Sequence, residues 1–212
     1  MNTRLAQVFS VVLHPLLMPT LLLGVLFFFA PSVIGVDILN PTLRITLLGF
    51  VSITTFVLPA LTIYYLYRAK YIKSLHMQDL ADRRLPYFVT ALLYALSTYF
   101  FTVQLRALSE ISPEIGIVLG SITVSILLVG IISLSWKISA HGVGIGGCFG
   151  AILGIAVKFS QTQLLYPLVI LTVLVGFLIS ARLYLNAHTP LQVIAGLSLG
   201  ILVSLLTVWQ FV

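Results

Sequence analysis

Charged residues are scarce in this chain: Asp, Glu, Lys and Arg make up only 8% of its 212 residues. Hydrophobic residues make up 60%, which is more apolar surface than a soluble domain of this length can hide in one core. The mean hydropathy of +1.16 therefore indicates an integral membrane protein. Because the apolar runs are long and uninterrupted, they favour helices over a membrane β-barrel.

Cysteine is almost absent, since Cys148 is the single one, and this excludes an intrachain disulfide. Cys148 lies in an apolar run, so we interpret it as a packed small residue rather than a reactive thiol. Lys and Arg outnumber Asp and Glu by 11 to 5, but they are scattered among short connections and form no basic tail. This pattern argues against nucleic acid as a partner and favours anionic membrane lipids.

Apolar runs of about 20 residues can cross the hydrocarbon layer of a membrane. By that length the chain divides into six to seven spans, near residues 5–30, 43–67, 86–107, 115–135, 142–159, 164–181 and 190–211. The first run is longer than a signal-peptide core and lacks a convincing cleavage site, so we expect it to be retained. We predict an all-α polytopic transmembrane helical bundle that forms a single domain over residues 1–212.

Three connections carry most of the polar chemistry, and they follow the second, fourth and sixth spans. Their sequences are SLHMQDLADRRLPY (74–87), WKISAHGVG (136–144) and ARLYLNAHTPLQ (181–192). Because two crossings separate each connection from the next, all three lie on one side of the membrane, which we call the site face. The opposite side has no histidine and no comparable grouping of polar residues, and its charges include Asp37, Arg106, Glu110, Glu114 and Lys158.

The last of these connections places a histidine at the start of the seventh span. Pro190 suits the first turn of a helix and Thr189 can cap it, so His188 lies just before the helix. Gln192 follows four residues later and can face His188. Its amide oxygen would hold one ring nitrogen and leave the other unprotonated, as a nucleophilic histidine requires. Arg182 precedes them at the end of the sixth span, where a guanidinium is suited to meet an anion.

The connection after the fourth span supplies a cation, a hydroxyl and a second imidazole, in Lys137, Ser139 and His141. They come directly before the glycine-rich run GVGIGG, which begins at Gly142. We interpret this run as a close helix-packing face. Its first backbone N–H groups can also favour an anion, as helix N-termini do.

The first connection adds two adjacent arginines. We expect Arg84 to belong to the site, whereas Arg83 is interpreted as a charge that sets the topology, and Asp79 and Asp82 as partners of neighbouring arginines. Histidines, cations and hydroxyls together describe a phosphate site that needs no metal or other cofactor. Two further histidines receive other interpretations. His14 is expected to be a buried group bonded to a backbone carbonyl, and His76 a solvated loop residue.

The third connection resembles an element of the type 2 phosphatidic acid phosphatase superfamily, which is related to the vanadium haloperoxidases. That element reads Ser-Arg, five residues, His, three residues, Asp. Here it reads Ala181-Arg182, five residues, His188, three residues, Gln192. The spacing is preserved, and Gln192 stands where the family has an aspartate.

The other two elements of the family signature are matched more loosely. The family's Pro-Ser-Gly-His corresponds to Ile138-Ser139-Ala140-His141. Its Lys, six residues, Arg-Pro corresponds to Arg84 and Pro86, which Leu85 separates, and no lysine stands at the expected distance before them. The resemblance covers residues 83–196, and Lys137 could supply the missing positive charge.

The resemblance implies a metal-independent phosphatase that acts on lipid phosphates or polyprenyl diphosphates. His188 would attack phosphorus to form a phosphohistidine, and His141 would protonate the leaving oxygen. Arg182, Arg84, Lys137 and Ser139 would hold the phosphoryl oxygens, with the first N–H groups of the helix that starts near Gly142. Gln192 can orient His188 but cannot neutralise its charge, so a slow or inactive lipid-binding relative is an alternative.

Two other classes of function compete with a phosphatase. The segment QDLADRR resembles the aspartate-rich segment with which membrane prenyltransferases hold magnesium diphosphate. Such enzymes usually have a second aspartate-rich segment, and the only other aspartate, Asp37, is expected on the opposite face. A transporter would place polar groups at mid-membrane, whereas here they gather at one end.

The distribution of basic residues bears on the orientation in the membrane, and we expect a bacterial inner membrane protein. Eight of the eleven Lys and Arg lie on the site face, namely Arg4, Arg68, Lys70, Lys73, Arg83, Arg84, Lys137 and Arg182. The positive-inside rule then predicts a cytoplasmic site face. If four of the eight serve phosphate binding, four basic residues remain on the site face against three on the opposite side, and this difference says little about the orientation. The oligomeric state is not determined by any of these patterns.

Overall fold

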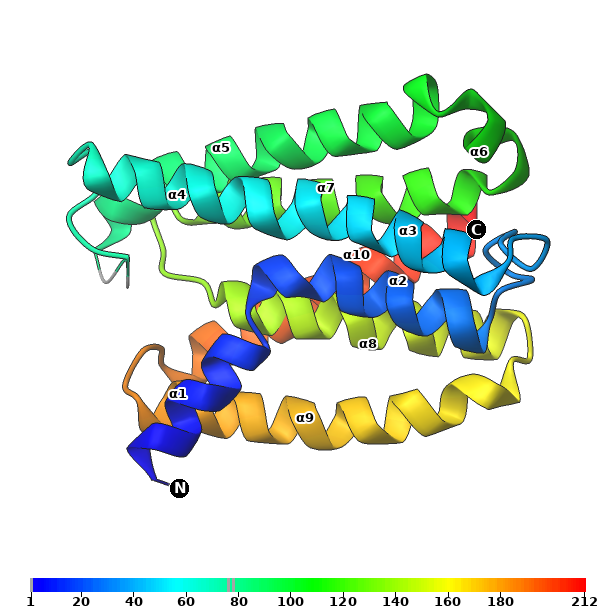
Figure 1. Ribbon diagram of the computed structural model, residues 1–212. Coiled ribbons are helices and arrows are strands. Elements are labelled where there is room, and N and C mark those ends of the chain that lie inside the picture. The colour runs from blue at the N-terminus through cyan, green and yellow to red at the C-terminus, as the bar shows by residue number, and fades with distance from the viewer. Residues whose placement is uncertain (1, 76, 78) are drawn as a thin grey trace.

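A computed structural model describes residues 2–75, 77 and 79–212, and all secondary structure within these ranges is helical (Figure 1). Among these described residues, seven helical segments are long and apolar enough to cross a membrane: Thr3–Phe29, Pro41–Arg68, Leu80–Gln104, Pro113–Ile132, Ala140–Lys158, Thr162–Tyr184 and Pro190–Phe211. The prediction of an all-α polytopic bundle is therefore confirmed. The prediction for His76 falls outside the described residues.

The described residues form ten α-helices and four short helical turns, and of these α6 lies between the third and fourth spans. The α-helices are α1 (Thr3–Val12), α2 (Met18–Phe29), α3 (Pro41–Ser52), α4 (Leu58–Arg68), α5 (Leu80–Tyr99), α6 (Arg106–Ile111), α7 (Pro113–Ile132), α8 (Ala140–Lys158), α9 (Leu165–Tyr184) and α10 (Pro190–Phe211). Turns of 3-10 helix form η1 (Pro15–Leu17) and η4 (Thr162–Leu164), and π-helical turns form η2 (Ile53–Val57) and η3 (Phe100–Gln104).

The third span begins earlier than predicted, at Leu80 rather than near residue 86. Pro86, with which the predicted span began, lies inside α5, although proline lacks the backbone N–H that a helix interior uses. Its missing hydrogen bond would have gone to the carbonyl of Asp82, still close to the start of the helix. The consequence is that Arg83 and Arg84 lie on a helix and point in directions about 100° apart.

The first span is broken in its middle. Pro15 disfavours a helical conformation of the residue before it, and His14 is accordingly extended, with φ −65° and ψ 137°. In Figure 1, α1 turns away from α2 at this break. It packs instead on α9, where the rings of Phe9 and Phe177 stack with their centroids 5.0 Å apart. The break and this packing bring the end of α1 beside the end of α9.

The helices α8 and α10 form the closest pair in the bundle. A Cβ atom at Gly142 or Gly150 would lie 2.9 or 2.7 Å from the backbone oxygen of Val193 or Ile201. Gly200 on α10 meets the backbone of α8 in the same way. Small residues let the two backbones approach, as is typical of membrane helices. The interpretation of GVGIGG as a helix-packing face is confirmed.

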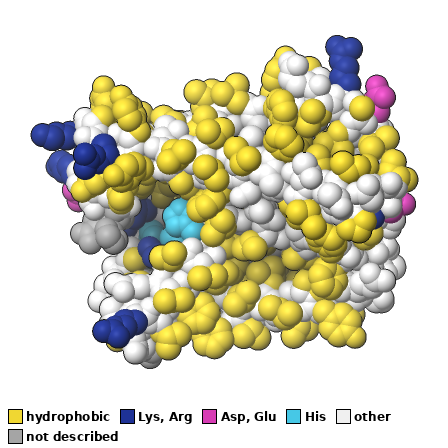
Figure 2. Space-filling view, viewed as in Figure 1, with side chains coloured by type: hydrophobic (Ala, Val, Ile, Leu, Met, Phe, Trp, Pro, Cys, Tyr) yellow, Lys and Arg dark blue, Asp and Glu magenta, His cyan; other side chains and the backbone are white. Residues whose placement is uncertain are grey.

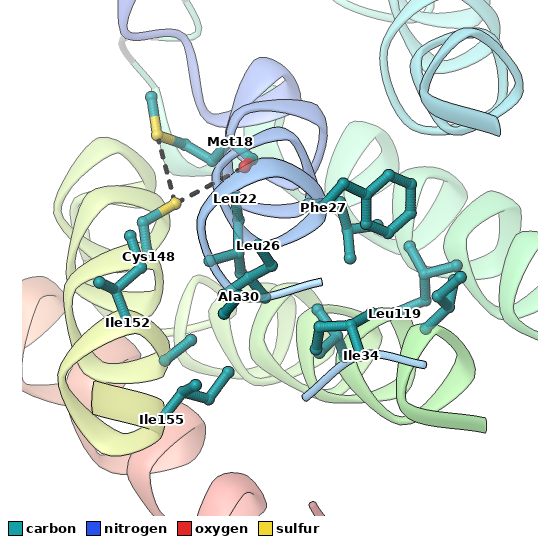
Figure 3. Packing of buried hydrophobic residues seen from close by; sticks show 14 of the residues in the cluster. Met18, Leu22, Leu26, Phe27, Ala30, Ile34, Leu119, Cys148, Ile152 and Ile155 are labelled. Carbon is teal, nitrogen blue, oxygen red and sulfur yellow. Dashed lines mark hydrogen bonds between the residues drawn. The ribbon is translucent and has the colours of Figure 1, made fainter. Parts of the chain in front are cut away.

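The helix α2 runs through the interior and anchors the hydrophobic core. Figure 3 shows its side chains Leu26 and Phe27 packed between residues of α7 and α8, such as Leu119 and Ile152. The thiol of Cys148 donates to the carbonyl oxygen of Met18 at 3.6 Å and lies 3.8 Å from its sulfur. Cys148 is 5% exposed, in agreement with a packed small residue.

The three polar connections meet at one end of the bundle, together with the N-terminal helix, and the C-terminus lies at the other end (Figure 1). This agrees with the predicted site face. Two basic residues at the far end bind backbone carbonyl groups. Arg44 donates to the oxygens of Phe27, Asp37 and Leu39 at 3.0–3.1 Å, and Lys158 donates to the oxygen of Val208 at 3.0 Å.

Candidate functional site

A cavity of about 460 Å³ extends from the site face into the bundle. Its walls are mostly apolar and come from α1, η1, α2, η2, α4, α5, α7, α8, α9 and α10. Among the described residues, the titratable side chains that line it are His14, Arg83, Tyr87, Tyr94, His141, Cys148, Arg182 and His188. In Figure 2, histidine and basic side chains are visible inside a hollow on the side of the bundle. The cavity thus joins a cationic end to a long apolar chamber.

His188 lies in the connection between α9 and α10, is 8% exposed, and is bonded as predicted. Its Nδ1 lies 3.2 Å from the Oε1 of Gln192. The backbone N–H of Thr189 donates to the same Oε1 at 3.1 Å, and the Oγ1 of Thr189 accepts from the backbone N–H of Gln192. This reciprocal capping box determines which way the amide of Gln192 points, because a backbone N–H can bond only to its oxygen.

An amide oxygen can only accept a hydrogen bond, so the Nδ1 of His188 carries a proton and its Nε2 keeps a lone pair in the neutral ring. Burial, followed by the nearby charges of Arg83 and Arg182, lowers the pKa of His188 to about 4, and the bond to Gln192 opposes this shift only in part. The imidazole is therefore neutral at pH 7. Neutrality and this tautomer are what a nucleophilic histidine needs.

Two guanidinium groups line the same cavity. Arg182, in the last turn of α9, donates from Nη1 to the Oγ of Ser10 at 3.3 Å, and its buried Nε has no hydrogen-bond partner in the described structure. Arg83 is 4% exposed and donates to the backbone oxygens of Met77 at 2.7 Å and Ile138 at 3.4 Å. None of the described cavity-lining residues is Asp or Glu. Uncompensated positive charge in such a site favours an anionic ligand.

His141, in the first turn of α8, lines the cavity as well, so the structure brings both predicted histidines to one site. Its Nε2 lies 3.0 Å from the backbone oxygen of Ser10. Because a carbonyl oxygen only accepts, Nε2 donates, and Nδ1 is the nitrogen that can gain or lose a proton. The ring of His14 meets the ring of His141 edge to face, with centroids 5.6 Å apart.

Three predicted phosphate ligands lie elsewhere. Ser139 is fully buried and caps α8, since its Oγ accepts from the backbone N–H of Gly142 at 3.2 Å. Gly142 itself packs against α10. Arg84 is exposed, does not line the cavity, and donates to the backbone oxygen of Leu134 at 2.9 Å. Arg83 occupies the place expected for Arg84, because the helix begins before both and turns by about 100° per residue.

Lys137 lies beside the site but not in the main cavity. It lines a neighbouring surface pocket with Asn186, Thr189 and Gln192, and His188 borders both spaces. Burial lowers the pKa of Lys137, as do Arg83 and Arg182. The lysine therefore adds to the positive field on the outer side of His188.

Sequence reasoning did not assign Ser10, His14 or Tyr87 to this site. Tyr87 follows Arg83 by four residues on α5, so the two share a helix face, and this spacing was available as a signal. His14 was expected to bond a backbone carbonyl, but its Nδ1 accepts from the backbone N–H of Leu16 at 3.3 Å. No local pattern indicates that Ser10 reaches His141, because 131 positions separate them.

Among the described residues, no group of three or more His, Cys, Asp or Glu is arranged to hold a metal ion. Comparisons with protein-family models, with curated proteins and with solved structures give no match for this chain. Its function is therefore inferred from the residues that surround the cavity.

Proposed function

We propose that this protein is a membrane phosphatase that removes phosphate from lipid phosphates or polyprenyl diphosphates through a phosphohistidine on His188. One observation carries the proposal: a neutral histidine with a free Nε2 borders the same cavity as Arg83 and Arg182, whose charges no lining carboxylate compensates. A nucleophile beside cations without acidic partners suits attack on a phosphoryl group.

In the first step the Nε2 of His188 attacks phosphorus, and the bond from phosphorus to the leaving oxygen breaks. The step requires a His141 that has gained a proton on Nδ1, which it gives to that oxygen while its Nε2–H stays bonded to the oxygen of Ser10. Water then attacks the phosphohistidine and breaks the bond between nitrogen and phosphorus. The proton that this water loses returns to His141, and inorganic phosphate leaves.

The chemistry of the cavity favours a substrate with an apolar chain. Beyond its cationic end the cavity is walled mainly by apolar side chains such as Leu22, Val118 and Ile122. Val11, on the outer surface of α1 and 68% exposed, also lines it. A membrane-resident amphiphile could place its phosphate against the arginines and its chain along these walls. The inner leaflet of a bacterial inner membrane is the proposed location of the site, from the excess of basic residues at this end.

Binding without turnover is the second candidate, because Gln192 stands where the resembled family has a charged aspartate. The amide holds the ring of His188 in the required tautomer but leaves the positive charge of a phosphohistidine without a counterion. A lipid-binding protein would need only the cavity and its arginines.

The test is a phosphate-release assay on the purified protein in detergent, across phosphatidic acid, phosphatidylglycerol phosphate, undecaprenyl diphosphate and lipid A. With phosphate-labelled substrate, an acid quench should leave acid-labile, base-stable label on the wild type and none on His188→Ala. The variant His141→Ala should form less label from substrates with poor leaving groups and nearly normal amounts from activated aryl phosphates. Label on His188→Ala would refute the assignment, and binding without release from any substrate would favour the second candidate.

A further inference from the structure

His14 belongs to the first span, which lies outside the segments that resemble the phosphatase signature, yet it lines the polar end of the cavity. It is half-buried at the break between α1 and η1. Its ring lies edge to face with the ring of His141, at 5.6 Å between centroids. The two neighbouring cavity residues Arg182 and His141 contact Ser10, one helical turn before His14.

The hydrogen bonds of the ring determine where its proton lies. The backbone N–H of Leu16 donates to the Nδ1 of His14 at 3.3 Å, so this nitrogen carries a lone pair. The neutral ring must then carry its proton on Nε2, the ring nitrogen farther from the backbone. A second proton on Nδ1 would place two donors face to face, beside the positive charge of Arg182, so the neutral form is favoured.

The Nε2–H of His14 is therefore a hydrogen-bond donor, and no partner for it exists within the described part of the chain. The imidazole of His141 meets the ring of His14 edge to face, with centroids 5.6 Å apart, and among the described residues no hydrogen bond joins the two rings. The buried Nε of Arg182 is a second donor without a partner. Donors converge at this end of the cavity, and an acceptor-rich ligand is what would satisfy them.

We propose that His14 is a phosphate-binding residue, which donates from Nε2 to an oxygen of the bound phosphoryl group as a neutral imidazole. The inference rests on the proposed function, because it takes the phosphoryl group as the ligand of the cavity. A neutral donor orients the bound phosphoryl group, and it adds no positive charge that would keep the product phosphate in the site. The first span thereby contributes a ligand as well as a wall.

Two substitutions separate this role from the structural role of His14 as the cap of η1. In His14→Asn the side-chain oxygen takes the place of Nδ1, so the cap for Leu16 is kept, but nothing reaches the position of Nε2. In His14→Gln the amide nitrogen reaches the position of Nε2, while the cap is weakened. His14→Asn therefore keeps the cap and loses the donor, whereas His14→Gln keeps the donor and weakens the cap.

The measurement is the affinity of the detergent-solubilised full chain for inorganic phosphate by calorimetry, together with kcat and KM on the lipid substrate. We expect His14→Asn to bind phosphate about tenfold more weakly with an unchanged melting temperature, since a hydrogen bond to a charged group is lost. His14→Gln should stay within about threefold of the wild type in phosphate affinity, even where its melting temperature falls.

Phosphate affinity unchanged in His14→Asn, or lost in a folded His14→Gln, would overturn the inference. Hydrolysis by the wild type with unchanged affinity in His14→Asn would remove His14 and leave the proposed function intact. Conversely, phosphate binding that depends on His14 in a protein that releases no phosphate and forms no phosphohistidine would refute the proposed function and retain His14 as a ligand. A wild type that binds no phosphate would overturn both.

Discussion

Replacing Gln192 by glutamate tests how His188 is made nucleophilic. The two side chains have the same shape, so Gln192→Glu can still accept from Thr189 and from the Nδ1 of His188, which lies 3.2 Å from the present amide oxygen. The difference is a negative charge beside the ring. Since an adjacent carboxylate stabilises imidazolium, the pKa of His188 must rise from about 4, typically by about 1–3 units.

The sign of the effect on activity follows from which form of His188 attacks. Only the neutral ring is a nucleophile, so activity of the wild type should fall as the pH drops through about 4. In Gln192→Glu this acidic limb should lie at a higher pH. At pH 8 the negative charge of Gln192→Glu stabilises the positively charged phosphohistidine. A rise of one unit in the pKa of His188 corresponds to about 1.4 kcal/mol, so the phosphohistidine should form about tenfold more favourably for each unit.

Removing the hydrogen-bond acceptor of His188 should slow the formation of the phosphohistidine. Gln192→Leu loses a neutral hydrogen bond, which is worth about 1 kcal/mol or roughly fivefold in rate, and lets the proton move to the attacking nitrogen. Because the capping box of α10 is also broken, Thr189→Val is the control: it removes the Oγ1 that accepts from the backbone N–H of Gln192 at 3.4 Å but keeps the bond to His188. Rapid-quench measurement of label at several pH values distinguishes them. Equal rates and pH profiles in all four proteins would refute the reasoning.

Three further predictions concern the cavity, the helix packing and the orientation. Arg83→Gln should lower kcat/KM by about 10–100-fold, as expected for a lost bond to a charged phosphoryl group, whereas Arg84→Gln should change it less than threefold in the same assay. Gly200→Ala should lower the melting temperature, because its Cβ would overlap the backbone of α8, and Gly176→Ala, with no atom within 4 Å, should not. A cysteine at the exposed Asn186 should resist an impermeant thiol reagent in intact cells, and prompt labelling would contradict a cytoplasmic site face.

Local patterns were sufficient to predict one part of the candidate site. Thr189 and Pro190 predict the start of a helix, and His188 and Gln192 stand four residues apart at that start. Residues with this spacing lie close together through local geometry alone, without a contribution from other helices. The same holds for the spans, because an apolar run of about 20 residues has few alternatives to a membrane helix. The convergence of three polar connections followed from counting crossings.

The helical membrane fold and the pairing of His188 with Gln192 therefore follow from local patterns along the chain. The packing of the helices settles that Arg83 rather than Arg84 lines the cavity, since this depends on where α5 begins and how it rotates against its neighbours. It likewise settles that Ser10 and His14 join His141, across more than 120 positions of chain. Contacts of this kind arise from the packing of α1 on α9 and of α8 on α10. That packing is set by the combined shapes of several helices, and no single segment encodes it.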